Sequence, residues 1–548
     1  MSGLLQHLLV LPIVVPLIAG AAMLLLPESA RSARVTIALT SMSAQLATAI
    51  ALLYLTTDAA PFIWPEGIGV YPIGAWPAPF GIVLVVDRLS ALMIALGTTV
   101  ALAALVYSVA RWDRPGQPFH SLFQFLMMGV NGAFLTGDLF NLFVFFEILL
   151  AASYGLMLRG LGTNRVRTGL HYIAVNLASS FLFLIGVALI YGVAGTLNMA
   201  DLTGKVAALG TADRALFDAG AAILGVAFLV KAGSWPLNFW LPGTYAIAIA
   251  PVSAVFAIMT KVGIYAVLRV GTLMGDDDAA AAMLGWILFY IGMATLAAGT
   301  IGMLASQHLA RLISFSVIVS SGLLLAALGL GIEALTAPVL FYLLTSVLTT
   351  GAFFMLTGMA DRARVPESAA AVDTTPPPRP YYVAFGVGDQ DPYSIDEEIG
   401  AAIPAAMAFL GLVFACCVLL IAGLPPLPGF VAKFALLSTA LGSAEAGAAA
   451  VWALAVAVLL SGIAAVFALT RVGMRLFWSA AARRTPRLRV LEALPVALLV
   501  LLTFGLSAAS GPVMMYLEAA ARSLHDPETY IRAVLSPQEG TGPGAREP

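Results

Sequence analysis

Residues 417–437 read CVLLIAGLPPLPGFVAKFALL, an apolar run of membrane-spanning length that is broken by Pro425, Pro426 and Pro428. Residues 222–242 read AILGVAFLVKAGSWPLNFWLP and are broken in the same way by Pro236. Proline removes a helical hydrogen bond, so each break frees backbone groups. Inside a membrane, such groups are tolerated only where protein or a cavity surrounds them. Matching breaks in two halves of a chain indicate inverted repeats with an ion path between them.

The composition of the whole sequence predicts a polytopic membrane protein. The chain has 548 residues, of which 61% are hydrophobic and 10% charged, and apolar runs of about 20 residues recur along its whole length. We predict an all-α integral membrane fold with about 14 transmembrane helices and two inverted five-helix repeats, each with a broken helix. The expected parts are a three-helix segment at 1–118, a first repeat at 119–272, a second repeat at 281–474, a basic loop with the last helix at 475–522, and a disordered tail at 523–548. The proline-rich and acidic stretch 359–400 is expected to be an exposed cytoplasmic loop within the second repeat.

Several classes of function are excluded by what the sequence lacks. Its net charge of -2 gives no basic field for a nucleic acid. Cys416 and Cys417 are adjacent in an apolar run, where a disulfide framework or a metal site is implausible. The sequence has no CxxC set, GxGxxG unit or P-loop, so we predict no cofactor, no metal site and no catalytic residues. The first apolar segment, 4–26, is expected to be retained as a membrane span.

The distribution of arginine predicts the orientation. Arginines gather in alternate loops, at positions 31, 34, 111, 114, 159, 165, 167, 311, 362, 364, 483, 484, 487 and 489. The loops between them are mostly neutral or acidic. By the positive-inside rule the arginine-rich loops are cytoplasmic, so both termini are expected to be periplasmic if the number of spans is even. The expected location is a bacterial inner membrane, with membrane lipids around the helices.

Four charged residues lie deep in the apolar segments. The chain has only four lysines, and three of them, Lys231, Lys261 and Lys433, lie in segments that must cross the membrane. The fourth buried charge is Glu147, in the run NLFVFFEILLAASYGLML. Arginine stays protonated in proteins, whereas a buried lysine can lose its proton. Ionisable residues in lipid-spanning helices indicate a proton or ion pathway.

A proton relay through these residues is our hypothesis. Lys231 is the expected partner of Glu147, because a pair that opens and closes can pass a proton between helices. A static buried ion pair is the alternative. Lys261 would stand between this pair and Lys433, with water or hydroxyls such as those of Thr260, Ser234 and Ser253 bridging the gaps. Arg269 is expected to anchor the end of the Lys261 helix at the membrane interface.

Three further groups of residues are candidates for minor roles. His171 could load or release protons on the cytoplasmic side, or could be a plain interfacial histidine. Asp138 is expected to lie near the outer end of the Glu147 helix, more as a helix-end residue than as a relay member. Ser314, Ser316, Ser320 and Ser321 recur along one helix, where they could hydrate a path or allow close helix packing, and packing is the favoured explanation.

Six stretches of the chain together resemble a known family. They are GDLFNLFVFFEILLAASYGLML (137–158), YGVAGTLNMADL (191–202), KAGSWPLNFWLPGTY (231–245), TKVGIYAVLRV (260–270), AIPAAMAFLGL (402–412) and AGLPPLPGFVAKFALL (422–437). Over nearly its whole length the sequence resembles the D subunit of the Mrp-type (Pha-type) multisubunit cation/proton antiporters. That family is related to the antiporter-like proton-pumping subunits of respiratory complex I and of membrane-bound hydrogenases.

The resemblance implies roles for the buried charges. Glu147 matches the essential glutamate of the fifth helix, Lys231 its partner in the seventh, Lys261 the central lysine of the eighth and Lys433 the lysine of the twelfth. Relatives often carry a histidine and a lysine in the eleventh helix, but this sequence has Thr345 and Thr350 near those places. The coupling path through the second half is therefore expected to differ.

The sequence thus predicts a proton-translocating subunit, and not an enzyme, within a larger Mrp-type complex that exchanges Na⁺ or K⁺ for protons. A redox-driven proton pump of a complex I or hydrogenase assembly is the alternative, and a structural membrane scaffold is a second one. Sodium prefers hard oxygen ligands. The sequence contains no dense cluster of carboxylates and hydroxyls for such a site, so the cation path is expected in another subunit or at an interface.

Overall fold

The computed structural model describes residues 6–27, 29–58, 63–112, 118–159, 162–274, 279–363, 405–443, 447–477 and 488–536. Most of the predicted loop at 359–400 and the end of the predicted tail lie outside these residues.

Helices make up nearly all of the described chain. Twelve are long and apolar enough to cross a membrane: α3 (Arg31–Leu55), α4 (Arg88–Val109), α6 (Leu139–Met157), α7 (Thr163–Ala194), α9 (Thr211–Ala232), α11 (Ala250–Met274), α12 (Ala279–Ala305), α13 (Leu309–Gly329), α14 (Thr336–Ala360), α16 (Ala405–Ala422), α18 (Ala448–Phe477) and α19 (Val490–Ala508). Three shorter apolar helices are α2 (Leu11–Leu25), α5 (Phe119–Leu135) and α17 (Pro428–Gly442). The remaining α-helices are α8 (Met199–Ala207), α10 (Trp240–Ile247), α20 (Ser510–Leu524) and α21 (Pro527–Leu535). Short 3₁₀ turns occupy His7–Leu9, Pro65–Gly67, Ile73–Ala75, Glu333–Leu335 and Asp361–Ala363.

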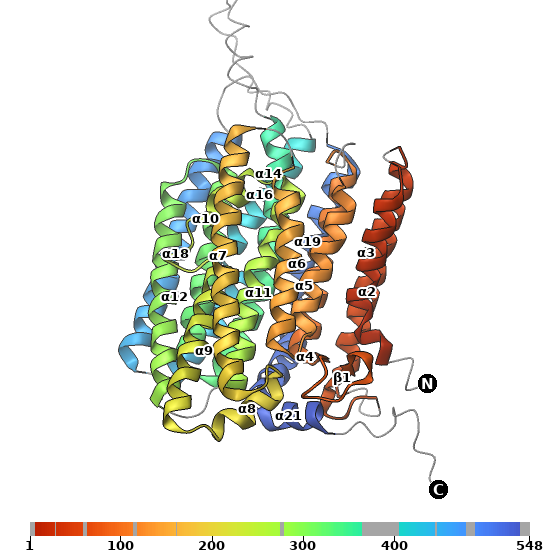
Figure 1. Ribbon diagram of the computed structural model, residues 1–548. Helices are drawn as coiled ribbons and strands as arrows, with labels where there is room; N and C mark the ends of the chain where they lie inside the picture. The colour runs from red at the N-terminus through yellow and green to blue at the C-terminus, as the bar shows by residue number, and fades with distance from the viewer. Residues whose placement is uncertain are drawn as a thin grey trace, which may run out of the picture.

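The long helices stand side by side in one bundle, whereas α8, α21 and the small sheet lie at its lower end (Figure 1). The predicted class, an all-α integral membrane protein, is confirmed, while the number of 14 spans stays a prediction. Three helices form the centre of the bundle. Of an apolar stretch of 18 residues in each helix, 89% is buried in α11, 89% in α13 and 94% in α14. Side chains on these helices therefore meet protein and not lipid.

Both predicted helix breaks are present. α9 ends at Gly233 and α16 ends at Gly423, and the two glycines have φ angles of 72° and 77°. Such positive angles are open to glycine at little steric cost, which is why glycine commonly ends a helix. Each glycine stands in the same pattern, Ala-Gly-x-x-Pro-Leu, at 232–237 and 422–427. The Trp235–Pro236 and Pro425–Pro426 peptide bonds are cis.

A small sheet and two C-terminal helices cap the lower end of the bundle. Strands β1 (Gly69–Pro72) and β2 (Val83–Val86) pair antiparallel, with Gly69 opposite Val86. Helix α4 begins at Arg88, directly after Asp87, which follows β2. The predicted disorder from residue 523 was wrong in part, because Asp526 caps α21 and Tyr530 of that helix is buried.

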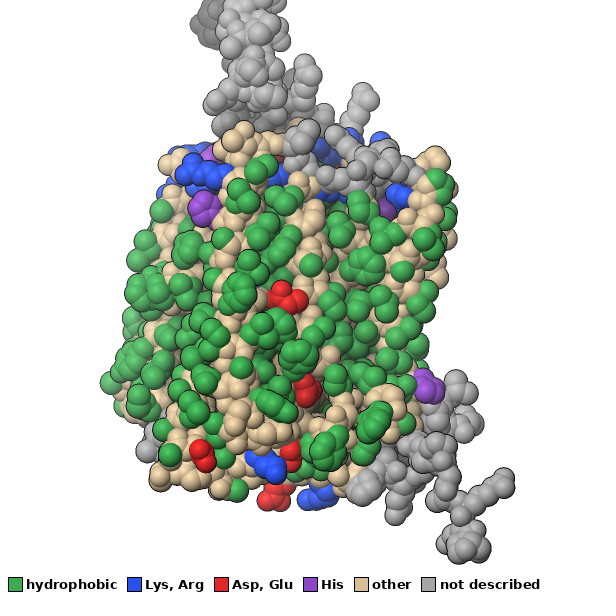
Figure 2. Space-filling view, in the orientation of Figure 1, with side chains coloured by type: hydrophobic (Ala, Val, Ile, Leu, Met, Phe, Trp, Pro, Cys, Tyr) green, Lys and Arg blue, Asp and Glu red, His purple; other side chains and the backbone are tan. Residues whose placement is uncertain are grey.

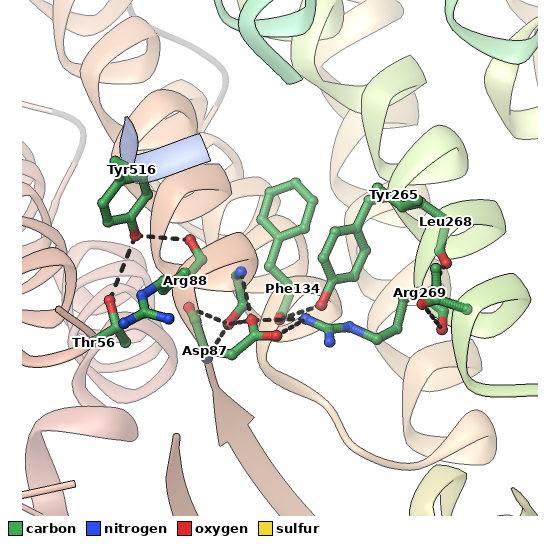
Figure 3. Close-up of polar contacts among 10 residues, drawn as sticks. Thr56, Asp87, Arg88, Phe134, Tyr265, Leu268, Arg269 and Tyr516 are labelled. Atoms are coloured by element: carbon green, nitrogen blue, oxygen red, sulfur yellow. Dashed lines mark hydrogen bonds and ion pairs between the residues drawn. The ribbon is translucent and has the colours of Figure 1, made fainter. Parts of the chain in front are cut away.

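A buried ion pair fastens the lower ends of α4 and α11. Asp87 caps α4, and its carboxylate oxygens lie 2.7 Å from Nη2 of Arg269 in α11. Asp87 is 3% exposed and Arg269 is 5% exposed. The ring of Tyr530 packs 5.5 Å from the guanidinium, and Tyr265 of α11 lies beside the pair (Figure 3). Arg269 thus lies at the lower end of the bundle, where its guanidinium is enclosed by protein and paired with Asp87.

The two ends of the bundle differ in charge. On the face drawn in Figure 2, basic side chains gather at the upper end, whereas acidic and basic side chains mix at the lower end. The described chain begins and ends at the lower end: His7 contacts Tyr71 of β1, and Arg532 of α21 contacts Glu66 just before β1. This arrangement is the one that the positive-inside rule predicts for a chain with both ends outside.

The orientation can be tested by labelling single cysteines after Cys416 and Cys417 are replaced by serine. His308, before α13, and Glu528, in α21, are both exposed and lie at opposite ends of the bundle. We expect a membrane-impermeant maleimide to label Glu528→Cys in intact cells and His308→Cys only in everted vesicles. The reverse pattern would overturn the orientation.

The Asp87–Arg269 pair should contribute strongly to stability. Removing one partner of a buried pair leaves an uncompensated charge and costs about 3–5 kcal/mol. Asp87→Asn is therefore expected to lower the unfolding temperature of the purified protein clearly. Asp218→Asn, which breaks the exposed Arg214–Asp218 pair, is the matched control and should cost under about 1 kcal/mol. Equal effects of the two substitutions would contradict the structural role of Asp87.

The same pair also predicts a dependence on pH. Burial raises the pKa of the Asp87 carboxyl, but the charge of Arg269 and the hydrogen bonds from Ser90 outweigh burial, so this pKa lies below its ordinary value. The stabilisation is therefore complete above the unfolded pKa of about 3.9 and is lost as pH falls through the lower folded value. The difference in unfolding temperature between wild type and Asp87→Asn should accordingly stay constant around neutral pH.

Candidate functional site

Glu147 lies in the middle of α6 with its side chain half-buried. Its Oε1 accepts a short hydrogen bond from the hydroxyl of Ser180 in α7. Asp138 stands at the start of the same helix, where its carboxylate accepts a hydrogen bond of 2.9 Å from the N–H of Asn141. Asp138 is therefore the N-cap of α6, and no described contact joins it to a buried lysine.

Lys231 lies in the last turn of α9 and is 5% exposed. Its Nζ donates to the side-chain oxygen of Asn176 at 3.3 Å and to the backbone oxygen of the same residue at 3.4 Å. Among the described residues, no ion pair joins Lys231 to Glu147. Asn176 and Ser180 are one turn apart on α7, so α7 holds the partners of both charges. Each of the two charges is thus bound to a neutral group of α7, and their pairing stays a prediction.

Lys261 is the central charge and is 2% exposed. It lies in α11, and its Nζ donates to the hydroxyls of Ser320 at 2.9 Å and Ser321 at 3.3 Å, both in α13. Ser320 in turn donates to the hydroxyl of Ser346 in α14 at 3.1 Å. Ser320 and Ser321 are buried between helices and also bind the lysine, a role that the sequence did not predict.

The hydroxyls that the sequence offered as bridges do not contact the lysines. Those of Thr260, Ser234 and Ser253 each donate to a backbone carbonyl close in sequence. Sequence spacing placed them near the charges but could not show which way they point.

Lys433 holds the second helix break together. It lies in α17, and its Nζ donates to the backbone oxygens of Ile421 at 2.9 Å and Ala422 at 3.0 Å, at the end of α16. A side chain at Gly423 would meet this lysine, since an added Cβ would lie 2.7 Å from its Cδ. The break and the charge are therefore one structural unit.

A cavity lies between this break and the centre of the bundle. Its volume is about 30 Å³, and α12, α13, α14, α16, α17 and α18 supply its walls. Ser320, which binds Lys261, and Lys433 both line it. A polar space of this kind can hold water that hydrogen-bonds to its walls. The cavity thus lies between Lys433 and a serine that binds Lys261.

Hydroxyls of α14 form one wall of the cavity: Thr345, Ser346, Thr349 and Thr350. Thr345 and Thr350 are the residues that stand near the places of the histidine and lysine of relatives. Ser346 and Thr349 were missed in the sequence. Their spacing in TSVLTT, at positions i, i+1, i+4 and i+5, puts them on one face of a helix and could have revealed the wall.

Of the remaining candidate residues, His171 does not line the cavity and the four prolines lie at the helix breaks. His171 is exposed on α7, and its Nδ1 lies 2.9 Å from the backbone oxygen of Arg167. No described contact joins it to the four buried charges. Pro236 and the pair Pro425 and Pro426 lie in the two breaks, and Pro428 is the first residue of α17.

A second buried carboxylate was missed in the sequence. Glu492, in the first turn of α19, is 0% exposed. Its Oε1 lies 2.8 Å from Arg362 and 3.2 Å from Arg111, so it joins the upper ends of α4, α14 and α19. Among the described residues, no group of three or more His, Cys, Asp or Glu side chains could hold a metal ion.

Comparison with known proteins places this arrangement in a family. Residues 136–373 match the family described as NADH:quinone oxidoreductase/Mrp antiporter, TM. The chain is 51% identical to the D subunit of a probable K(+)/H(+) antiporter of Rhizobium meliloti, over 99% of this chain and 100% of that protein. It is 33% identical to the D subunit of a Na(+)/H(+) antiporter of Alkalihalophilus pseudofirmus, over 97% of this chain and 99% of that one.

The fold is similar to a solved one. A chain in the structure of the Mrp complex from a Dietzia species superposes with a TM-score of 0.79 and 25% identity, over 97% of this chain and 100% of that chain. Two curated relatives above 30% identity are matched along nearly their whole length. The chain therefore belongs to the family of D subunits of the Mrp-type cation/proton antiporters.

Proposed function

We propose that this protein moves protons along Glu147, Lys231, Lys261 and Lys433 inside a multisubunit complex that exchanges Na⁺ or K⁺ for protons. One observation carries the proposal: Lys261 binds Ser320 at one end of a hydroxyl-lined cavity, and Lys433 lines the other end. Three buried ammonium groups without a carboxylate partner among the described residues are costly in a membrane, and such groups mark ion and proton paths.

The names of relatives support an antiporter over a redox-driven pump. The two relatives above are named as K(+)/H(+) and Na(+)/H(+) antiporter subunits. The protein would itself carry out no covalent chemistry and would take its energy from an ion gradient. Its partners would be the other subunits of a Mrp-type complex, its transported ions H⁺ with Na⁺ or K⁺, and its surroundings the lipids of the bacterial cell membrane, with both termini periplasmic.

Two inverted repeats, at 119–272 and 281–474, would form the two halves of the path. The shared pattern at the two breaks, with a left-handed glycine in each, supports this division. Lys261 belongs to the first repeat and its partners Ser320 and Ser321 to the second. The central hydrogen bonds would therefore join the two halves.

The relay can be tested with the whole complex in everted vesicles, by measuring how Na⁺ or K⁺ dissipates a proton gradient. We expect Lys261→Ala and Glu147→Gln to abolish exchange at matched levels of assembled complex, because each removes a group that binds and releases a proton. Lys205→Ala, which changes the exposed lysine of α8, is the control and should exchange normally. Unchanged exchange in the first two variants would make the buried charges structural.

The contribution of Ser320 can be isolated with two serines of one helix. Ser320→Ala removes the hydroxyl that binds Lys261, whereas Ser314→Ala removes one that donates only to the backbone of Ala310. A hydrogen bond to a charged group is worth about 1.5–3 kcal/mol, and loss of that much from a transfer step slows it about tenfold or more. We expect such a fall in exchange rate for Ser320→Ala alone. Equal rates in both variants would remove Ser320 from the path.

A further inference from the structure

The cavity beside Lys433 presents oxygen lone pairs rather than hydroxyl hydrogens. Thr345, Ser346, Thr349 and Thr350 each donate their hydrogen to a backbone oxygen of α14, at 2.7–3.0 Å. On the facing side, Ser461 of α18 does the same, at 2.8 Å. A hydroxyl oxygen that donates its only hydrogen elsewhere can act toward the cavity only as an acceptor. Such a wall attracts positive charge.

Lys433 shows where a positive charge sits in this cavity. Its ammonium group rests on the backbone oxygens of Ile421 and Ala422, which the helix break leaves without helical donors. An ammonium group and a potassium ion are similar in size, and both prefer several oxygen ligands. Backbone carbonyl oxygens replace the hydration shell of K⁺ in selective channels. The end of α16 and the wall of α14 together supply the same ligand types.

We propose that this cavity binds the transported monovalent cation, K⁺ or Na⁺, at the oxygen atoms that hold the Lys433 ammonium group in this structure. The inference rests on the proposed function, because it assumes that the complex exchanges such a cation. Two positive charges a few ångströms apart repel strongly in a protein interior. The ion and the ammonium group at this place therefore exclude each other.

The charged and titratable groups around the cavity are compatible with a monovalent cation. Lys433 and Tyr342 are the titratable side chains among its described lining, and Lys261 lies behind Ser320. The described lining includes no carboxylate, so the ligands are neutral oxygens. The sequence predicts the cation path in another subunit or at an interface, whereas this proposal places a cation site here. Four of the lining hydroxyls lie on α14, and those of Ser316, Ser320 and Ser461 join them only in the folded protein.

The test uses the whole complex reconstituted in vesicles and measures the half-saturating concentrations of K⁺ and Na⁺ in exchange. The variant is Thr349→Val with Thr350→Val, which removes two ligand oxygens and keeps the shape of the wall. Thr357→Val is the matched control, because Thr357 is also buried in α14 and donates to its backbone but does not line the cavity. We expect a rise of about tenfold or more in the half-saturating concentration of the transported cation for the double variant. We expect no change for the control.

Direct binding gives a second readout. Radioactive rubidium, as a substitute for K⁺, is measured on the purified complex by equilibrium dialysis, with K⁺ and Na⁺ as competitors. We expect the Thr349/Thr350 variant to lose rubidium that wild type binds, and Lys433→Met to bind at least as much as wild type, because the competing ammonium group is gone. Unchanged binding in the double variant, or loss of binding in Lys433→Met, would overturn the proposal.

The outcomes separate this site from the relay. A double variant whose maximal rate falls equally for K⁺ and Na⁺, at unchanged half-saturating concentrations, would show a cavity that carries protons only and would overturn the cation site. If Lys261→Ala stops exchange while the double variant is normal, the relay stands and the cation site falls. If the double variant binds cation poorly while Lys261→Ala exchanges normally, the cation site stands and the relay falls.

Discussion

The architecture of this protein depends on the backbone oxygens that a broken helix leaves free inside a membrane. Hydrocarbon offers no donors to such groups, so protein must supply them. At the second break, the Lys433 ammonium group binds the oxygens of Ile421 and Ala422. At the first break, the N–H of Trp235 donates to the hydroxyl of Thr295 in α12, at 2.8 Å. Each break is thus stabilised by a hydrogen bond with a side chain that comes later in the chain, Thr295 at the first break and Lys433 at the second.

The lysines beside the two breaks bind different groups. Lys231 precedes its break and donates to the amide oxygen of Asn176 in α7. The same helix carries Ser180, which donates to Glu147. Lys433 follows its break and binds carbonyl oxygens beside a wall of hydroxyls. The first half therefore combines a carboxylate with an amine, whereas the described surroundings of Lys433 offer only neutral oxygens.

Local sequence pattern predicted the membrane class, most helix positions, both breaks and the burial of Lys231 and Lys261, whereas Lys433 is partly buried. These follow from hydropathy and from proline and glycine, which act within a few residues. The pairing of Asp87 with Arg269 and the burial of Glu492 were not predicted, because each depends on helices that are far apart in the sequence. The cavity was not predicted for the same reason, since Ser320, Thr349 and Ser461 come from three different helices. The sequence also could not show which face of a helix turns inward, and the described partners of Thr260 and His171 are backbone oxygens of their own helices.

Charges in the middle of the membrane differ from charges near the ends of the bundle. At the lower end Arg269 is paired with Asp87, and at the upper end Arg362 is paired with Glu492. Arginine does not give up its proton, and a carboxylate partner fixes its position. The lysines in between bind only neutral oxygens among the described residues, so nothing there holds their charge permanently. Ion pairs thus hold the ends of the bundle, whereas the lysines between them, which the proposed relay would use, bind neutral oxygens.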